Sequence, residues 1–225
     1  MLYKLNIQFF GGRGASSSSG GGGSGSGKLG HPREQRDDYT PEQYKALEDY
    51  TSSSSINKHL GVEGYDNMDA YYKNMADNLD KAIAKSGWNK TETNTPYMRG
   101  AGAIVVGVPQ DMKFKSQQDL ADYINKNSVG NKYVNEGYTS ITTQHHTAKS
   151  FADTQKGKNP IILEYAKIKK GTKGAYVSGG NGKKPISVFG SIEDETLMQR
   201  KVKTTPISAW VGNDGYVHVA VIAGG

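Results

Sequence analysis

The sequence contains no cysteine among its 225 residues, which excludes a disulfide framework and any thiolate metal site. It also lacks any apolar run close to the ~20 residues that a membrane helix needs. The apolar stretch Leu5–Phe10 is shorter than the ~7–15-residue core of a secretion signal, and no cleavage-like site follows it. We therefore expect a soluble chain without a membrane partner, in a reducing compartment. An export route that needs no N-terminal signal stays open.

Foldable sequence is also missing from the N-terminal part of the chain. Residues Gly11–Gly30 are almost wholly glycine and serine, and such a composition cannot bury enough apolar surface to offset chain entropy. The polar, charged run up to Thr40 continues this character. We predict a flexible Gly/Ser-rich tail over residues 1–40 and one domain over residues 41–225, which is enough chain for a single substantial core.

Acidic residues are fewer than basic ones, which gives a net charge of +6 and a pI of about 9.2. Lysines concentrate in one stretch: Lys156, Lys158, Lys167, Lys169, Lys170, Lys173, Lys183 and Lys184. Such a stretch attracts nucleic acid or the phosphates of a dinucleotide, but it is more often a solvated face. Because few aromatic residues lie between these lysines, nucleic acid is the less favoured partner.

The pattern of apolar residues changes from helical to strand-like along the chain. Helices are predicted at Pro41–Tyr50 with Thr40 as N-cap, at Asp66–Ser86 closed by Gly87, at Ser116–Asn127, and at His145–Thr154. Strands are predicted at Ala103–Val108, Ile161–Ile168, Ala175–Ser178, Ile186–Gly190, Glu195–Val202, Pro206–Gly212 and Tyr216–Ala223. The turn Asn213–Gly215 indicates a hairpin between the last two. This order favours an α+β fold.

The adjacent histidines His145 and His146 do not predict a metal site. On a helix their side chains point about 100° apart, so they cannot chelate as an i, i+4 pair would. Neither cysteines nor a carboxylate cluster surround them in the sequence. We interpret them as surface residues of a helix.

Three short motifs carry the functional prediction. In "SIEDETLMQR", Glu193 and Glu195 would lie on one face of a strand, about 7 Å apart, with Asp194 on the other. One carboxylate could stabilise a developing cation and the other could accept a proton from a nucleophile, which suits displacement at a sugar carbon. Read alone, the motif is more typical of a solvated strand end.

The two other motifs are similarly weak when each is read alone. Arg99 directly precedes the predicted strand at Ala103 and could grip a diphosphate with both arms of its guanidinium. Ser140 and Thr142 alternate on one face of a short strand, where a hydroxyl could bond a carboxylate across the sheet and fix its rotamer.

In this order, Arg, Ser-x-Thr and Glu-x-Glu resemble the Arg–Ser–Glu class of mono-ADP-ribosyltransferases, which includes the clostridial binary toxins and related exoenzymes. The resemblance covers Asp66–Gly225 and includes "KKGTKGAYVSGGN" before "EDETLMQR". It implies an ADP-ribosyltransferase-like fold, with N-terminal helices packed on a two-sheet mixed β core. One departure is Ser140-Ile141-Thr142 where the family usually has Ser-Thr-Ser.

The resemblance also implies a role for each motif residue. Arg99 would hold the NAD phosphates, Gly100 would offer backbone groups to the nicotinamide amide, and Tyr97 would pack near the adenine side. Ser140 would orient Glu195, the catalytic glutamate, and Thr142 would help position NAD. Glu193 would help the acceptor attack. Phe189 and Ile192 would lie in a loop that contacts the target protein.

The implied activity is transfer of ADP-ribose from NAD to a target, with release of nicotinamide and without a metal. In the family a glutamate at the position of Glu193 goes with arginine as acceptor, so a protein arginine is expected. NAD glycohydrolysis and a structural protein with a degenerate transferase fold remain the alternatives.

The N-terminal "NIQFFGGRGASSS" resembles tails of bacteriophage head-associated proteins that carry such a domain. This resemblance implies a phage or prophage protein that modifies a host protein and either acts in the host bacterial cytoplasm or travels in the virion.

Overall fold

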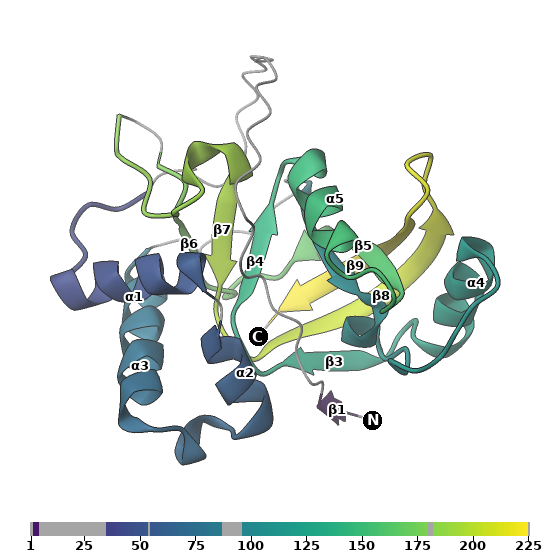
Figure 1. The fold of residues 1–225 in the computed structure, drawn as a ribbon, viewed down its shortest axis with the longest axis horizontal. Helices are drawn as coiled ribbons and strands as arrows, with labels where there is room; N and C mark the ends of the chain where they lie inside the picture. The colour runs from purple at the N-terminus through teal and green to yellow at the C-terminus, as the bar shows by residue number, and fades with distance from the viewer. Residues whose placement is uncertain (1, 5–34, 54, 87–95, 180–181, 225) are drawn as a thin grey trace.

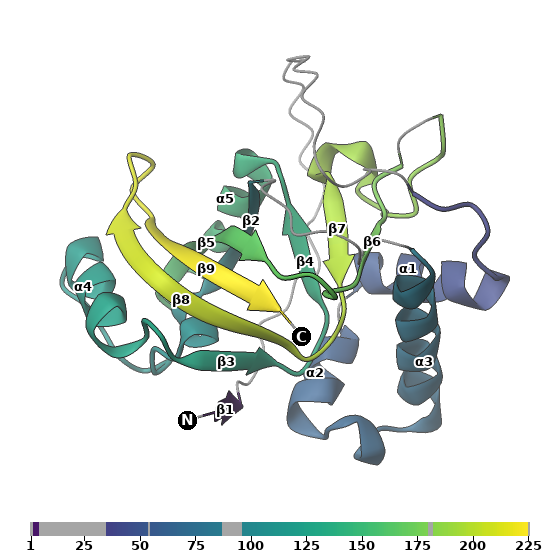
Figure 2. The ribbon, with the colours of Figure 1, turned by 180° about the vertical axis from the view of Figure 1, so that it is seen from behind.

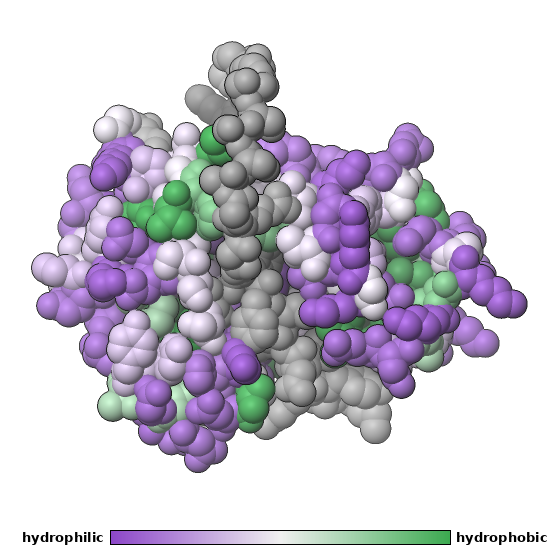
Figure 3. Space-filling view, viewed as in Figure 1, coloured by the Kyte–Doolittle hydropathy of each residue, from purple (hydrophilic) through white to green (hydrophobic). Residues whose placement is uncertain are grey.

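The computed structural model describes residues 2–4, 35–53, 55–86, 96–179 and 182–224. The helices α1 (Pro41–Ser52), α2 (Ser55–Val62) and α3 (Ala70–Lys85) group at one end of the molecule, and a curved sheet extends from them towards α4 (Gln117–Asn127) at the other end (Figures 1 and 2). The face seen in Figure 3 is mainly hydrophilic, with small separated apolar patches. Within these ranges no helix has the length and apolar character needed to cross a bilayer.

The first helix begins where its capping chemistry predicts. The N-terminal helices are α1 (Pro41–Ser52), α2 (Ser55–Val62) and α3 (Ala70–Lys85). Thr40 caps α1 through a reciprocal pair of hydrogen bonds with Gln43. Pro41 occupies the first helical position, where a backbone N–H would have no helical partner, so proline costs no hydrogen bond there. The predicted start of this helix is therefore confirmed.

The start predicted for α3 at Asp66 is wrong by about one turn. Residues Tyr65–Asn67 form a separate 3₁₀ turn, η1, and the N-cap is Asp69, whose carboxylate accepts from the Tyr72 N–H at 3.0 Å. The proposed closing residue, Gly87, lies outside the described residues. The helices α4 (Gln117–Asn127), capped by Ser116, and α5 (His145–Asp153) are confirmed.

Nine strands among the described residues form one mixed sheet. They are β1 (Leu2–Lys4), β2 (Tyr97–Gly102), β3 (Lys132–Asn135), β4 (Thr139–Thr142), β5 (Pro160–Ile168), β6 (Gly174–Tyr176), β7 (Glu195–Met198), β8 (Val202–Val211) and β9 (Val217–Gly224). Their order is β1-β3-β8-β9-β5-β2-β4-β7-β6. The pairs β1–β3 and β5–β9 are parallel and the other neighbours are antiparallel, which confirms an α+β fold with a mixed sheet.

Where two sheets were expected, the strands are joined into one, but the junction is a single register pair, Met98 with Thr142. Two hydrophobic clusters lie on the sheet. One packs α1–α3 against β6 and β7. The other packs α4 and the 3₁₀ turn η2 (Ala103–Val106) on the larger half, and it also contains Ile141 of β4 and Met198 of β7. The sheet therefore opens where β2 and β4 part, while the second cluster continues across that junction.

Two of the predicted strands are wrong. The apolar run Ala103–Val108 begins with the 3₁₀ turn η2, and the strand is the segment before it, β2. Here burial overrides β-propensity, since Ala103, Val106 and Val108 all enter the larger core. The run Ile186–Gly190 passes through bends and a turn, because the N–H groups of Ile186 and Ser187 both donate to the Val177 carbonyl.

Parts of the predicted tail belong to the folded body. Leu2–Lys4 pairs with β3, and Gln35 is buried, where its amide bonds the Lys184 carbonyl at 2.7 Å and the Gly179 and Ile186 N–H groups at 3.0 Å. The Gly/Ser-rich stretch itself lies outside the described residues.

Candidate active site

The pairing of β4 with β7 brings Ser140 beside Glu195. Thr142 lies opposite Glu195 and Ser140 opposite Leu197, so the serine and the glutamate are diagonal neighbours on one face. Ser140 Oγ donates to Glu195 Oε1 at 2.6 Å, the hydrogen bond that the sequence predicted. The Glu195 N–H donates to Ser178 Oγ at 2.7 Å, so that side chain and backbone are both fixed.

Glu195 is only 8% exposed. Burial raises its pKa, and hydrogen bonds from Ser140 and Ser187 offset part of that rise. A carboxylate held in such a site interacts strongly with positive charge, because little water competes for it. Glu195 is therefore suited to stabilise a cation that develops in front of it.

Glu193 and Glu195 do not lie on one face of a common strand, so that prediction is wrong. Gly190–Glu193 forms the 3₁₀ turn η3, Asp194 is left-handed with a φ of 47°, and β7 begins at Glu195. Aspartate tolerates this backbone conformation better than most residues. Asp194 is buried, accepting from the Tyr176 hydroxyl at 2.9 Å and from Thr143 Oγ1.

Despite this different backbone, both glutamates line one cleft. The cleft is lined by Met98, Arg99, Ser140, Ile141, Thr142, Thr147, Ala148, Phe151, Glu193 and Glu195. The turn that carries Glu193 is held in place by Thr142, whose hydroxyl donates to the Glu193 carbonyl at 2.6 Å and accepts from the Gln144 N–H at 2.9 Å.

The sequence suggested that Arg99 lies just before a strand, but Arg99 lies within β2. Its side chain is only 3% exposed, and burial lowers the pKa of the guanidinium, an effect that Tyr165 and Tyr50 oppose. A buried cation of this kind favours an anionic ligand. Arg99 also lines a second pocket, together with Tyr133, Asn135, Thr139 and Tyr165.

Gly100 has a packing reason to be glycine. A Cβ atom built there would lie 2.0 Å from the Ala148 carbonyl oxygen and 2.3 Å from the Ala152 nitrogen, both in the backbone of α5. The helix can therefore reach β2, and its residues Thr147, Ala148 and Phe151 can form a wall of the cleft, only because residue 100 has no side chain.

The remaining predicted residues divide between core and surface. Tyr97 is buried in the larger hydrophobic cluster, and Ile141 is buried there too, on the strand face opposite Ser140. This alternation explains why an apolar residue fits the middle of Ser-x-Thr. Phe189 is half-buried at the start of η3, whereas Ile192 is 73% exposed.

Sequence reasoning missed Tyr50 of α1. Its hydroxyl lies 3.5 Å from Ser140 Oγ and also bonds the Tyr138 carbonyl at 3.4 Å and Asn57 at 3.2 Å. Burial raises the pKa of Tyr50 to about 12, so the hydroxyl keeps its proton at neutral pH. In the sequence Tyr50 was only the last residue of a predicted helix, and nothing there indicated a polar contact.

His145 and His146 are exposed residues at the start of α5, which confirms their interpretation as surface residues of a helix. The neighbours of His145 were not predicted. Asp214 and His218, which are distant in sequence, lie beside it, and one potential ligand atom from each of the three residues falls within a 4.8 Å cluster. His146 lies outside this cluster.

The sequence profile of the ADP-ribosyltransferase exoenzyme family matches residues 27–211. The chain belongs to this family. It is an NAD+ ADP-ribosyltransferase, with NAD as its substrate, and the cleft described above is its candidate active site.

Solved structures share the fold of this transferase. Plx2a, an ADP-ribosyltransferase toxin from Paenibacillus larvae, is 24% identical, with a TM-score of 0.64 over 82% of this chain and 86% of that one. An ADP-ribosyltransferase from Clostridium botulinum is 16% identical, with a TM-score of 0.62 over 83% and 88%. A protein from S. aureus, solved with NAD, is 18% identical with the same TM-score and coverage. No curated protein matches the sequence.

Replacing Ser140 with alanine tests whether its hydroxyl positions Glu195. We expect kcat to fall about 100-fold, since a displacement of about 1 Å in a reacting group has that effect. The hydrogen bond from Ser140 lowers the pKa of Glu195 in the wild type. In Ser140→Ala this bond is absent, so the pKa of Glu195 rises further and the acidic limb of the pH–rate profile moves to higher pH. A slower enzyme with an unchanged acidic limb would show that Ser140 does not act through the carboxylate.

Proposed function

We propose that this transferase moves ADP-ribose from NAD to an arginine side chain of a target protein and releases nicotinamide, with Glu195 and Glu193 as its two catalytic carboxylates. The observation that carries the proposal is that both glutamates line one cleft with a buried arginine, Arg99, while Ser140 holds Glu195 through a 2.6 Å hydrogen bond.

Arg99 supplies the charge that a dinucleotide requires. Its guanidinium can donate two parallel hydrogen bonds to the diphosphate, and a buried position strengthens them. Gly100, next to it in β2, offers backbone groups to the nicotinamide amide. Thr142 supports the turn beneath Glu193, and Tyr97 packs behind the strand on the adenine side.

In the reaction, the bond between nicotinamide nitrogen and ribose C1′ breaks, and its electron pair leaves with neutral nicotinamide. The ribose becomes an oxocarbenium-like cation, and the Glu195 carboxylate stabilises it. A guanidine nitrogen of the acceptor then forms a bond to C1′. Its proton passes to the Glu193 carboxylate and from there to solvent. Every step uses side chains of this chain and the two substrates.

Arginine is the proposed acceptor because Glu193 lies just before β7, two residues ahead of Glu195. A carboxylate at this position can attract and deprotonate a guanidinium. A protein of this fold has been seen with a bound guanidine compound, since the ADP-ribosyltransferase Vis was solved in complex with agmatine. The exposed Ile192 and the adjacent Phe189 give the target protein an apolar contact beside the cleft.

Replacing Glu193 with glutamine tests the acceptor step separately from NAD cleavage. With agmatine as acceptor, we expect transfer to fall by about 10²-fold or more, the usual contribution of a general base. Hydrolysis of NAD, measured as nicotinamide release without agmatine, should stay within a few-fold of wild type, because Glu195 and Arg99 are intact. Equal loss of both activities would place Glu193 in bond cleavage instead. Hydrolysis without any transfer in the wild type would identify an NAD glycohydrolase.

The N-terminal resemblance to head-associated phage proteins supports a further proposal about setting. The protein would be encoded by a phage or prophage, be packaged in the virion, and modify a protein in the host bacterial cytoplasm. Mass spectrometry of purified virions tests this, and its failure would leave the transferase activity unaffected.

A further inference from the structure

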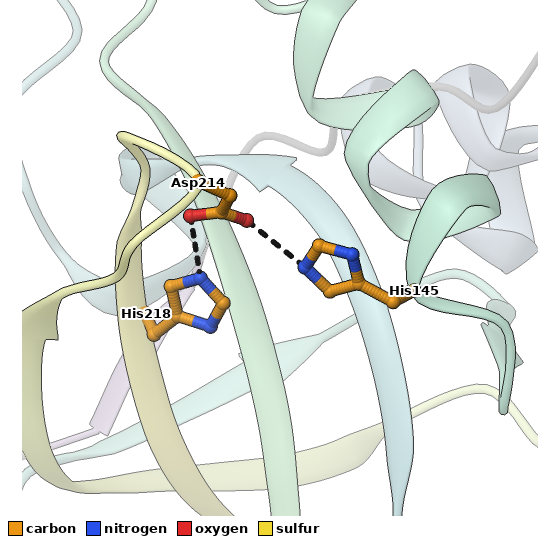
Figure 4. Close-up of side chains that lie close together, drawn as sticks. All are labelled: His145, Asp214 and His218. Carbon is orange, nitrogen blue, oxygen red and sulfur yellow. Dashed lines mark hydrogen bonds and ion pairs between the residues drawn. The ribbon is translucent and has the colours of Figure 1, made fainter.

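Outside the transferase cleft, two histidines and an aspartate converge from separate elements. His145 opens α5, Asp214 lies in the turn between β8 and β9, and His218 lies in β9 (Figure 4). The two carboxylate oxygens of Asp214 face one imidazole each, at 2.9 Å from His145 Nε2 and 3.0 Å from His218 Nε2. The same ring nitrogen of both histidines therefore points at one place.

The second ring nitrogen of His218 has its own carboxylate partner. His218 Nδ1 lies 2.6 Å from Glu164 Oε1, which comes from the neighbouring strand β5. A carboxylate on the far nitrogen is the arrangement that orients metal-binding histidines and increases their basicity. The ring is also fixed by stacking, with the Trp210 ring centroid at 5.7 Å and the His145 centroid at 6.0 Å.

Burial makes one side of the cluster rigid and leaves the other side open. The side chains of His218 and Asp214 are 8% and 14% exposed, whereas that of His145 is 48% exposed. Two donors are thus held in place by the sheet and its hairpin, and the third faces solvent. An incoming ion would keep an open position for water next to His145.

We propose that His145, Asp214 and His218 form a binding site for a divalent transition metal of the zinc type, with Glu164 as the outer partner of His218. Ligands about 2.0–2.1 Å from a tetrahedral zinc ion lie about 3.4 Å from one another. The Asp214 oxygens already lie 2.9 and 3.0 Å from the two imidazole nitrogens, and the three ligand atoms fall within 4.8 Å of one another. Two imidazoles and one carboxylate suit zinc, cobalt or nickel, whereas magnesium and calcium prefer oxygen ligands alone.

The ion would join α5 to the β8–β9 hairpin. Because α5 also packs on Gly100 and forms a wall of the NAD cleft, metal binding would brace that wall from outside. The site takes no part in the proposed transfer of ADP-ribose, whose steps occur at Glu195 and Glu193. Its role is thus distinct from catalysis and can be tested without measuring activity.

The test uses the full chain without a histidine tag, stripped of metal and titrated with Zn²⁺ against a chromophoric chelator. We expect one zinc ion per chain and a melting temperature that rises with zinc. His145→Ala and Asp214→Asn should each weaken binding by at least 10-fold, while His146→Ala, which removes the exposed neighbouring imidazole, should bind as the wild type does. Co²⁺ bound to the wild type should give the intense visible absorption of a tetrahedral site, and His145→Ala should lose it.

Three results would overturn the proposal. Absence of stoichiometric zinc binding would reduce the cluster to a hydrogen-bonded network, as would equal affinity in all four proteins. An effect of His146→Ala as large as that of His145→Ala would indicate adventitious surface binding. His145→Ala keeps the test decisive even if changes at Asp214 disturb the hairpin, since it alters an exposed side chain.

Discussion

Replacing Glu195 with glutamine should lower the turnover of NAD by about 10³-fold and leave NAD affinity within a few-fold of wild type. Glutamine keeps the size of the side chain and an oxygen that can accept the Ser140 hydrogen bond, so the cleft should retain its shape. What is lost is the negative charge, which acts only when the ribose becomes cationic. Removal of an interaction made in the transition state lowers kcat and spares ground-state binding.

Calorimetric titration with NAD and nicotinamide release under saturating NAD measure these two quantities separately. A variant that turns over at more than a tenth of the wild-type rate would remove Glu195 from the chemistry. A variant that no longer binds NAD would place Glu195 in substrate binding instead.

Gly100→Ala should have the largest effect on stability. The new methyl group would overlap backbone atoms of α5 at 2.0 and 2.3 Å, and backbone cannot move aside as a flexible side chain can. Overpacking of a rigid contact costs about 3 kcal/mol, and the helix must shift to relieve it. Because α5 lines the NAD cleft, affinity for NAD should fall as well.

Gly130→Ala is the matched control for this change. A Cβ atom there meets open space, and only its positive φ of 80° opposes the substitution, at a cost of about 1–2 kcal/mol. Urea unfolding of both variants gives the comparison. If Gly100→Ala unfolds no more easily than Gly130→Ala, the close approach of α5 to β2 is not what fixes residue 100.

Predictions that depended on local chemistry agreed best with the structure. Thr40 and Ser116 cap their helices, and the turn at Asn213–Gly215 closes a hairpin, because capping and turn formation involve only neighbouring residues. The contact between Ser140 and Glu195 was also predicted, because the family resemblance implies that Ser140 orients Glu195.

Predictions failed where tertiary packing decided the outcome. The run at Ala103 has the composition of a strand but forms a 3₁₀ turn, because several of its residues are needed in one core. Glu193 lines the cleft because the next residue, Asp194, has a left-handed backbone conformation, which the spacing of residues in the sequence does not predict. His145 lies beside Asp214 and His218, which belong to a hairpin about 70 residues later in the chain. Only the order of strands in the sheet brings them together.

In the most direct measurement, biotinylated NAD is incubated with the purified protein and a bacterial lysate, and the Glu195→Gln variant is treated in parallel. A transferase that uses Glu195 should label discrete protein bands, the variant should label none, and free nicotinamide should appear with the wild type alone. Contradiction would come from well-folded wild type that gives neither label nor nicotinamide, or from a variant that labels the same bands equally well.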